Sequence, residues 1–371
     1  MVSLGINEEY AVERMRLLHL HPEFTGEAYL WTMRDSLGND SVISTERDLF
    51  FVASKVGTYY IRLNIIDNTD PVEHNVKVVV WQEQVAYSRY ITKVYEYRPA
   101  PGQFVNLLPE YKEGDTEESM CEKVLECIGD KNDVLISLGG YGGYVTFGFD
   151  HTVANVPGEM DFKILGNSFY AEANPNPNAP ESGGSSEPGI VMVALDRNGN
   201  GLPDDEWYEL AGSDYWLSTT KRNVELTYYN PHYNDRYTVP WAMKWEENGE
   251  TKYEYGAVVT NNFHKHTFYP DYYYNQDNPD ESKRWYNPSV SRDSITFTGM
   301  TNIRGCIDMR SPSYIEFYSY SGFGYCDNKG FVKDDARIAQ NPYGRPSLGE
   351  TAGDGMDISW AVDKDGNYVD L

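Results

Sequence analysis

Alternating apolar and polar positions run from Arg14 to about Trp81. In the segment 27–33, EAYLWTM, Tyr29 and Trp31 face one side of an extended backbone, and Leu30 and Thr32 face the other. Three further runs, DLFFVAS, GTYYIRLNIID and HNVKVVVW, begin at residues 48, 57 and 74 and are rich in β-branched and aromatic residues. Several short strands in about 70 residues predict an immunoglobulin-like sandwich for residues 1–83.

Residues 84–113 lack this alternation. The stretch YRPAPGQFVNLLPEYKEGD, which begins at Tyr97, is rich in Pro and Gly. Such a composition predicts an extended linker that packs on the neighbouring domain.

A single helix is predicted directly after the linker, in the segment DTEESMCEKVLECIGD. Asp115 is the expected N-cap, Glu118 the expected capping-box partner, and Gly129 the residue that stops the helix. Apolar residues recur at helical spacing at Met120, Val124, Leu125, Cys127 and Ile128. The pattern favours a helix that packs against the core.

Strand-type runs return after residue 132. They read DVLISLGG, GYVTFGFD, FKILGNSF, GIVMVALD, NVELTYY, YTVPWAMKW, YGAVVTNNF, SITFTGM and YIEFYSY. Strands do not alternate with helices, so a parallel α/β fold is not expected. Residues 114–371 are therefore predicted to form a larger, jelly-roll-like β-sandwich with long loops, and the fold class is all-β with one short helix.

One acidic segment, LDRNGNGLPDDEW from Leu195 to Trp207, has the spacing of a calcium loop. Counted from Asp196, oxygen-bearing groups fall at alternate positions and Gly201 takes the sixth, where a sharp turn is needed. Trp207 occupies the twelfth position, where a bidentate acid belongs, so a neighbouring acid must substitute. The expected ligands are Asp196, Asn198, Asn200, the carbonyl of Leu202, Asp204 and Glu206.

The alternative for this segment is a solvated Asn-Gly hairpin turn without a metal ion. A turn alone does not need clustered carboxylates, which repel one another when no cation is present. The segment lacks flanking helices, so a calcium-dependent switch is not expected. A structural Ca²⁺ site is therefore the preferred interpretation of this segment.

Aromatic residues are abundant, with 31 tyrosines and a 14% share of Phe, Trp and Tyr. Many lie in loops that are polar between the rings. Complete burial of these loops would leave their polar groups without hydrogen-bond partners. Flat rings beside Asn, Asp and Arg suit a sugar face or the flat face of a corrinoid. The alternative is that half or more of the rings simply cover the sandwich. The predicted ligand-binding residues are Trp207, Tyr215, Trp216, Tyr233, Trp241, Tyr272, Tyr273 and Trp285.

Charge and hydropathy restrict the partners. A net charge of −26 repels a phosphate backbone, so nucleic acid is not an expected partner. No apolar run approaches the roughly 20 residues that cross a bilayer. The opening MVSLGINEEY lacks the pattern of a signal peptide, which leaves a cytoplasmic protein or one that starts after a removed signal or lipid anchor.

Other candidate chemistry is weaker. His264 and His266, and also His19 and His21, are spaced by two and could share a metal on a strand, but a third ligand is not evident. Cys121 and Cys127 are six apart, a poor spacing for a disulfide. Two further cysteines, Cys306 and Cys326, could pair.

Catalytic motifs are scarce. There is no Gly-x-Ser-x-Gly elbow, and the glycine-rich GGYGGY at residues 139–144 lacks the Lys of a phosphate loop. It fits a tight turn with tyrosines at its tips. A glycoside hydrolase with a pair of carboxylates remains the enzymatic alternative.

Two stretches resemble known families. YLW, VGTYYIRLNIIDN and HNVKVVV resemble a PKD-type domain, although TMRDSLGND stands where the usual Gly-Asp-Gly turn is expected. The runs SLGGYGGYVTFGFDHTVANVPGEMDFKILGNSF, EPGIVMVALDRNGNGLPDDEWYELAGS, NNFHKHTFYP, GYCDN and GDGMDISWAVDKDGNYVDL resemble a family of Bacteroidetes cell-surface proteins. That family pairs a PKD-like domain with a β-sandwich.

The second resemblance implies a setting. Its members are lipoproteins outside the outer membrane, associated with nutrient capture, and some accompany corrinoid uptake systems. We therefore expect a non-catalytic surface protein, anchored by a lipidated N-terminus, that captures a corrinoid (vitamin B12-type) or a glycan. An outer-membrane transporter complex is an expected partner. A hydrolase and a structural or adhesive protein are the alternatives.

Overall fold

A computed structural model of the chain describes residues 4–67, 71–131, 134–156, 158–171, 183–185, 187–231, 238–259, 269–270, 293–303, 322–328 and 354–371. In these ranges it contains twenty β-strands and one α-helix. The predicted all-β fold class with one short helix is confirmed. Nowhere in these ranges is a helix long and apolar enough to cross a membrane.

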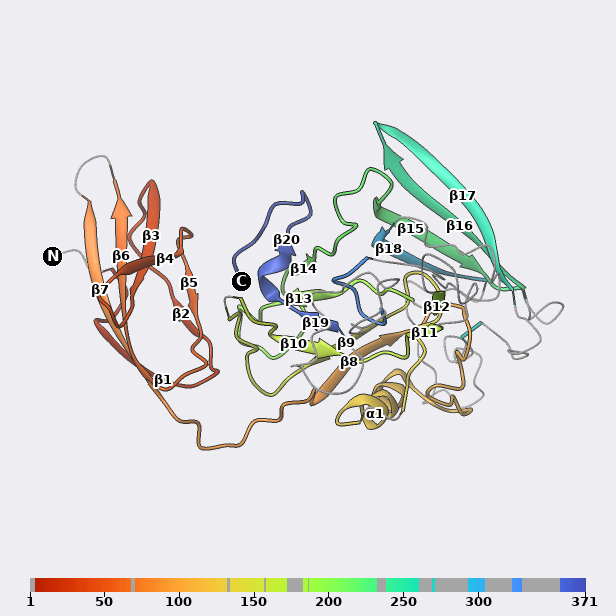
Figure 1. Cartoon of the computed structure of the whole chain (residues 1–371), viewed down its shortest axis with the longest axis horizontal. Coiled ribbons are helices and arrows are strands. Elements are labelled where there is room, and N and C mark those ends of the chain that lie inside the picture. The colour runs from red at the N-terminus through yellow and green to blue at the C-terminus, as the bar shows by residue number, and fades with distance from the viewer. Residues whose placement is uncertain are drawn as a thin grey trace.

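The first part of the chain forms a two-layered sandwich, drawn in red and orange in Figure 1. One layer has the strand order β1-β7-β6-β3-β4, with β1 parallel to β7 and the other pairs antiparallel. The other layer pairs β2 with β5. The strands are β1 (Glu9–Glu13), β2 (Leu18–Leu20), β3 (Ala28–Arg34), β4 (Asp40–Ser44), β5 (Leu49–Phe51), β6 (Gly57–Ile66) and β7 (Val72–Trp81).

The core of this sandwich follows from the alternation in its strands. In β6, Ile61, Leu63 and Ile65 are buried while the residues between them are more accessible, because successive side chains of a strand point to opposite faces. Trp31 of β3 is completely buried among them, and its indole Nε1 donates to the carbonyl of Glu46 at 3.0 Å.

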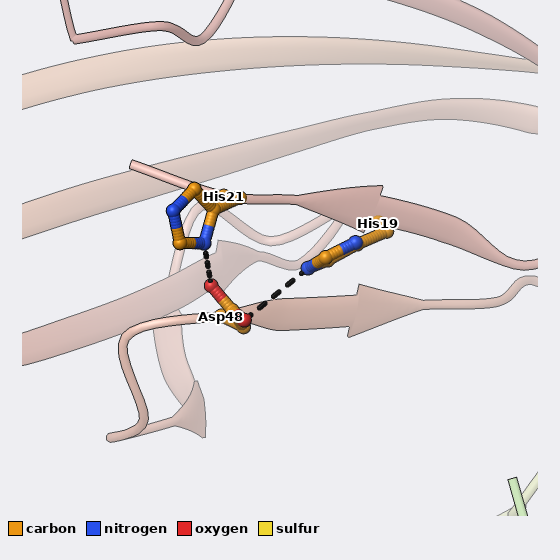
Figure 2. A group of neighbouring side chains, drawn as sticks. All are labelled: His19, His21 and Asp48. Carbon is orange, nitrogen blue, oxygen red and sulfur yellow. Dashed lines mark hydrogen bonds and ion pairs between the residues drawn. The ribbon is translucent and has the colours of Figure 1, made fainter. Parts of the chain in front are cut away.

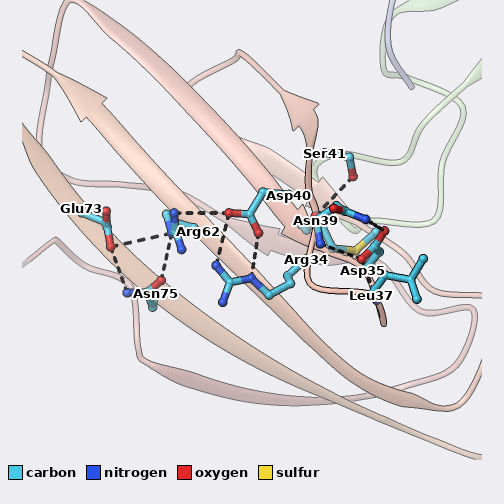
Figure 3. Close-up of polar contacts among 10 residues, drawn as sticks. Arg34, Asp35, Leu37, Asn39, Asp40, Ser41, Arg62, Glu73 and Asn75 are labelled. Carbon is cyan, nitrogen blue, oxygen red and sulfur yellow. Dashed lines mark hydrogen bonds and ion pairs between the residues drawn. The ribbon is translucent and has the colours of Figure 1, made fainter.

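A charged network covers the outer face of the same sheet (Figure 3). Arg34 donates to Asp40, its cross-strand partner, at 2.8 Å, and Arg62 of β6 reaches Asp40 at 3.4 Å. In the turn between β3 and β4, the carboxylate of Asp35 accepts backbone N–H groups of Leu37 and Asn39, each at 2.8 Å. The turn in TMRDSLGND is thus stabilised by the aspartate side chain.

The second part of the chain is built from several smaller sheets. A four-stranded antiparallel sheet has the order β17-β16-β15-β18, and a three-stranded sheet has the order β13-β14-β20. Two-stranded sheets pair β8 with β9, β10 with β19 and β11 with β12. The bounds are β8 (Lys93–Arg98), β9 (Tyr144–Gly148), β10 (Phe162–Ile164), β11 (Phe169–Ala171), β12 (Gly183–Ser185), β13 (Met192–Ala194), β14 (Trp207–Leu210), β15 (Lys221–Tyr229), β16 (Thr238–Glu247), β17 (Glu250–Val259), β18 (Ser294–Asn302), β19 (Asp354–Met356) and β20 (Ala361–Val362).

The predicted linker contributes to this second part. Its residues 93–98 form β8, which pairs with β9, so the linker adds a strand to a sheet besides connecting the two parts. The first and second parts also touch directly. The backbone N–H of Thr152 donates to the carbonyl of Met15 at 3.1 Å, and the guanidinium of Arg197 lies 4.7 Å from the ring centre of Phe50.

Helix α1 (Glu117–Ile128) packs on β8, and Gly129 is its C-cap as expected. The predicted N-terminal cap was wrong by one residue. Thr116 is the N-cap: its hydroxyl accepts from the Ser119 backbone N–H at 3.2 Å, and Ser119 Oγ accepts from the Thr116 N–H at 2.9 Å. Asp115 instead accepts from the Ser119 hydroxyl and pairs with Lys123.

Within the described residues one predicted strand does not form, and the predicted strand YIEFYSY at residues 314–320 lies outside them. Residues 134–139 of DVLISLGG run without a strand ladder, because their polar groups bond to the linker. Ser137 illustrates this: its N–H donates to the Leu108 carbonyl at 2.7 Å, and its carbonyl accepts from the Tyr97 hydroxyl at 2.6 Å. The following glycines form the predicted tight turn, with positive φ at Gly139 and Gly142.

Candidate ligand-binding cleft

A cleft of about 2230 Å³ opens in the second part of the chain. Pockets for drug-sized molecules have about 300–1,000 Å³, so this cleft has room for a larger ligand. Its lining comes from segments that are far apart in sequence, among them the glycine-rich turn, β9, β10, β13, β14 and β18, and it reaches Met15 and Ser54 of the first part.

Strand β14 presents two contrasting side chains to the cleft. Its four residues alternate in burial: Tyr208 and Leu210 pack into the core on one face, so Trp207 and Glu209 share the other. Both of these line the cleft, together with Met192, the cross-strand partner of Glu209. An exposed indole and a carboxyl group therefore stand two residues apart on one wall.

Glu209 is held in a largely buried position. Its Oε2 accepts from the Thr301 hydroxyl at 2.5 Å, while its Oε1 is buried and has no hydrogen-bond partner in the described part of the chain. Burial raises the pKa of Glu209 from 4.5 to about 7, and Thr301 and the charge of Arg222 oppose the shift. A cleft carboxyl with such a pKa is a feature of functional sites.

The raised pKa of Glu209 predicts a pH-dependent stability. Between pH 4.5 and about 7 the unfolded chain loses the proton that the folded chain keeps, so the free energy of unfolding falls as the pH rises. A shift of this size corresponds to about 3 kcal/mol across the window. Residue 209 of Glu209→Gln cannot titrate. As the pH rises from 4.5 to about 7, the free energy of unfolding of wild type should therefore fall by about 3 kcal/mol more than that of Glu209→Gln.

Urea unfolding of both proteins at a series of pH values measures this difference. Thr301→Val removes the hydrogen bond that lowers the pKa of Glu209 but keeps the titrating carboxyl group, so it should show at least the pH dependence of wild type. A constant difference between wild type and Glu209→Gln over the whole window would show that Glu209 has an ordinary pKa.

The predicted ligand-binding rings fall into three groups. Tyr233, Tyr272, Tyr273 and Trp285 lie outside the described residues. Trp207 and Trp216 are exposed, and of these two Trp207 lines the cleft. Tyr215 and Trp241 are buried, which removes both from any surface that meets a ligand.

The two buried rings are covered by identifiable neighbours. Trp241 pairs across strands with Gly256, and a Cβ at that glycine would come within 2.3 Å of the indole, so the missing side chain makes room for the ring. The guanidinium of Arg222 lies 4.2 Å from the ring centre of Tyr215 and 5.5 Å from that of Trp216. The sequence does not reveal either arrangement.

The acidic segment connects β13 to β14 and therefore lies directly before Trp207. The Asp196 carboxylate accepts backbone N–H groups of Asn200 and Gly201 at 3.1 and 3.0 Å. The Asp204 carboxylate accepts from the side-chain amides of Asn198 and Asn200 at 3.1 and 2.9 Å, which lowers the pKa of Asp204. Two acids and two amides thus converge within one loop.

These residues fit a calcium ion in part. Asp196, Asn198, Asn200 and Asp204 carry oxygen atoms of the hard type that Ca²⁺ takes, while the side-chain oxygen of Asn198 accepts the backbone N–H of Asn200 at 2.9 Å. Glu206 instead accepts from the Tyr208 hydroxyl at 2.8 Å. The carbonyl of Leu202 is the ligand expected at the seventh position of the loop, and the Leu202 N–H donates to Asn200 Oδ1 at 2.8 Å. A bound ion would stiffen the loop that carries Trp207.

Calcium is expected to raise the melting temperature of the chain. At a hundredfold excess over Kd, binding to the folded state adds about 2.7 kcal/mol, or a shift of roughly 5 °C. Asp196→Ala should melt at the same temperature with Ca²⁺ and with chelator, whereas Asp365→Ala, which changes an acid in another loop, should respond like wild type. Scanning calorimetry distinguishes the two, and an unaltered response in Asp196→Ala would remove the calcium assignment.

Several other chemical candidates have definite positions. Cys121, Cys127 and Cys326 carry free thiols, and burial raises the pKa of Cys326 to about 12. Cys306, the proposed partner of Cys326, lies outside the described residues, as do His264 and His266. Sequence reasoning missed the cleft and the buried position of Glu209 on its wall, for which the alternation in WYEL was the available signal. Neither family models nor curated proteins give a match to this chain.

Proposed function

We propose that the chain is a non-catalytic ligand-binding protein of the cell surface, which captures a corrinoid or a glycan for nutrient uptake. The observation that carries the proposal is the large cleft with Trp207 exposed on its wall. An indole face provides an apolar surface for a flat ligand or a sugar ring, and the polar groups around it give orientation. A lipidated N-terminus and an outer-membrane transporter partner belong to the same proposal.

The test is calorimetric titration of the full chain with cyanocobalamin and with a panel of oligosaccharides. One of these two ligand classes should bind, and Trp207→Ala should weaken that binding about tenfold or more. Trp216→Ala is the matched control, because Trp216 is exposed but does not line the cleft. Absence of heat with every ligand would exclude capture of either class.

Glu209 supports a second candidate, a glycoside hydrolase. A general acid of such enzymes needs a pKa near neutrality, which burial provides here. The assay is release of reducing ends from the same oligosaccharides. Hydrolysis that is lost in Glu209→Gln would favour the enzyme, whereas binding without hydrolysis would favour the capture protein.

A further inference from the structure

Two histidines and an aspartate gather on the face of the first sandwich whose Phe50 contacts Arg197 of the second part, and none of the three lines the cleft. The register of β2 and β5 pairs His19 with Phe50 and Leu20 with Leu49. Continuing this register places Asp48 opposite His21. Leu20, Leu49 and Phe51 are buried in the core. Because successive side chains of a strand point to opposite faces, His19, His21 and Asp48 lie on the face opposite to this core.

The three polar side chains point toward one another (Figure 2). Asp48 Oδ2 lies 3.3 Å from His19 Nε2, and Asp48 Oδ1 is hydrogen-bonded to His21 Nδ1. One ligand atom from each residue lies within 4.8 Å of the others. The ring of His19 is also stacked on Phe50, with centroids 4.4 Å apart, which fixes its orientation.

We propose that His19, His21 and Asp48 form a binding site for a zinc-type divalent metal ion. Imidazole nitrogen and carboxylate oxygen are ligands that Zn²⁺ takes at about 2.0–2.2 Å, which in a tetrahedral site separates neighbouring ligand atoms by about 3.3 Å. The His19–Asp48 pair has this separation already. The His21 Nδ1 and Asp48 Oδ1 atoms, which are hydrogen-bonded to each other, must move apart to admit the ion.

The surroundings favour a transition metal over calcium. Two of the three ligand atoms are imidazole nitrogens, which suit zinc and its neighbours, whereas calcium takes oxygen ligands. All three side chains are partly solvent-accessible, so an ion can enter without unfolding. Three protein ligands leave a fourth position for water or for a group from another molecule.

The ion would also have a structural consequence. Strands β2 and β5 have three residues each and pair only with one another in the described part of the fold, which makes their sheet intrinsically weak. A metal held by His19 and His21 from one side and Asp48 from the other would cross-link them. Zinc is therefore expected to protect this layer of the sandwich from opening.

The test is calorimetric titration of Zn²⁺ into the metal-stripped full chain, without a polyhistidine tag and with excess Ca²⁺ present. One tight site per chain is expected. His19→Ala, His21→Ala and Asp48→Asn should each weaken it by more than about 100-fold, because loss of a ligand exceeds the 10–100-fold effect of losing a ligand's supporting partner. Substitution of Co²⁺ should give the visible absorption of a tetrahedral site in wild type.

His74→Ala is the matched control, since it removes a histidine of β7 outside the cluster and should leave the zinc site unchanged. Asp196→Ala should also bind zinc normally, which separates this site from the acidic loop. Circular dichroism establishes that each variant is folded. Zinc binding that is equally tight in the three ligand variants, or absent from wild type, would overturn the proposal.

Discussion

Gly139→Ala is expected to destabilise the second part of the chain by more than about 4 kcal/mol, a loss that few single substitutions reach. Gly139 has a φ of +73°, and an added Cβ would lie 1.7 Å from the carbonyl oxygen of Ala100. That oxygen belongs to the backbone and cannot swing aside as a flexible side chain would. The Ala100 N–H also donates to the Leu138 carbonyl at 2.9 Å, which ties the two segments together.

Gly249→Ala separates the two causes of this loss. Gly249 has nearly the same φ, +77°, but nothing lies within 4 Å of its added Cβ. Gly249→Ala should therefore lower the free energy of unfolding only by the penalty for a left-handed backbone, about 1–2 kcal/mol. Urea unfolding of both variants measures the difference, and equal losses would mean that the turn at Gly139 can move away from Ala100. Because Gly139 lines the cleft, its variant should also lose ligand binding.

Trp31→Ala should have the second-largest effect, confined to the first sandwich. Truncation of a fully buried Trp leaves a large cavity and costs about 3–5 kcal/mol. It also leaves the Glu46 carbonyl without its indole donor. If residues 1–83 fold as a domain of their own, the lower melting temperature should belong to one calorimetric transition, while the transition of residues 114–371 stays in place.

Trp81→Ala is the control in the same sheet. Trp81 stands at the end of β7 with 41% of its surface exposed, so its truncation should change the free energy of unfolding by no more than about 0.5 kcal/mol. A single transition that shifts as a whole in Trp31→Ala would show that the two parts unfold together, against the proposed boundary.

Local patterns predicted four of the seven strands of the first sandwich, β3, β5, β6 and β7, and the single helix, but not β1, β2 and β4. The alternation in GTYYIRLNIID places Ile61, Leu63 and Ile65 in the core, and β6 spans residues 57–66. The helix cap was misplaced because Thr116 and Asp115 are both good caps, and only the backbone geometry at Thr116 decides between them.

Features that depend on pairing between distant segments could not be predicted. Asp48 joins His19 and His21 only through the register of β2 with β5, which the sequence does not specify. The sequence favoured exposed loop rings for Tyr215 and Trp241, but Arg222 lies over Tyr215, and Trp241 packs into the core, where Gly256 leaves room for it. The alternation in WYEL predicts that Trp207 and Glu209 share one face of a strand. The cleft that this face lines could not be predicted, because its other walls come from distant segments.

Ligand titration of wild type against two tryptophan variants tests the central claim most directly. Calorimetry with cyanocobalamin and the oligosaccharide panel should show binding of one ligand class to the wild-type chain. Trp207→Ala should weaken it about tenfold or more, and Trp216→Ala should leave it unchanged. Equal affinities in all three proteins, or no binding of any ligand to wild type, would contradict a ligand-capture role for this cleft.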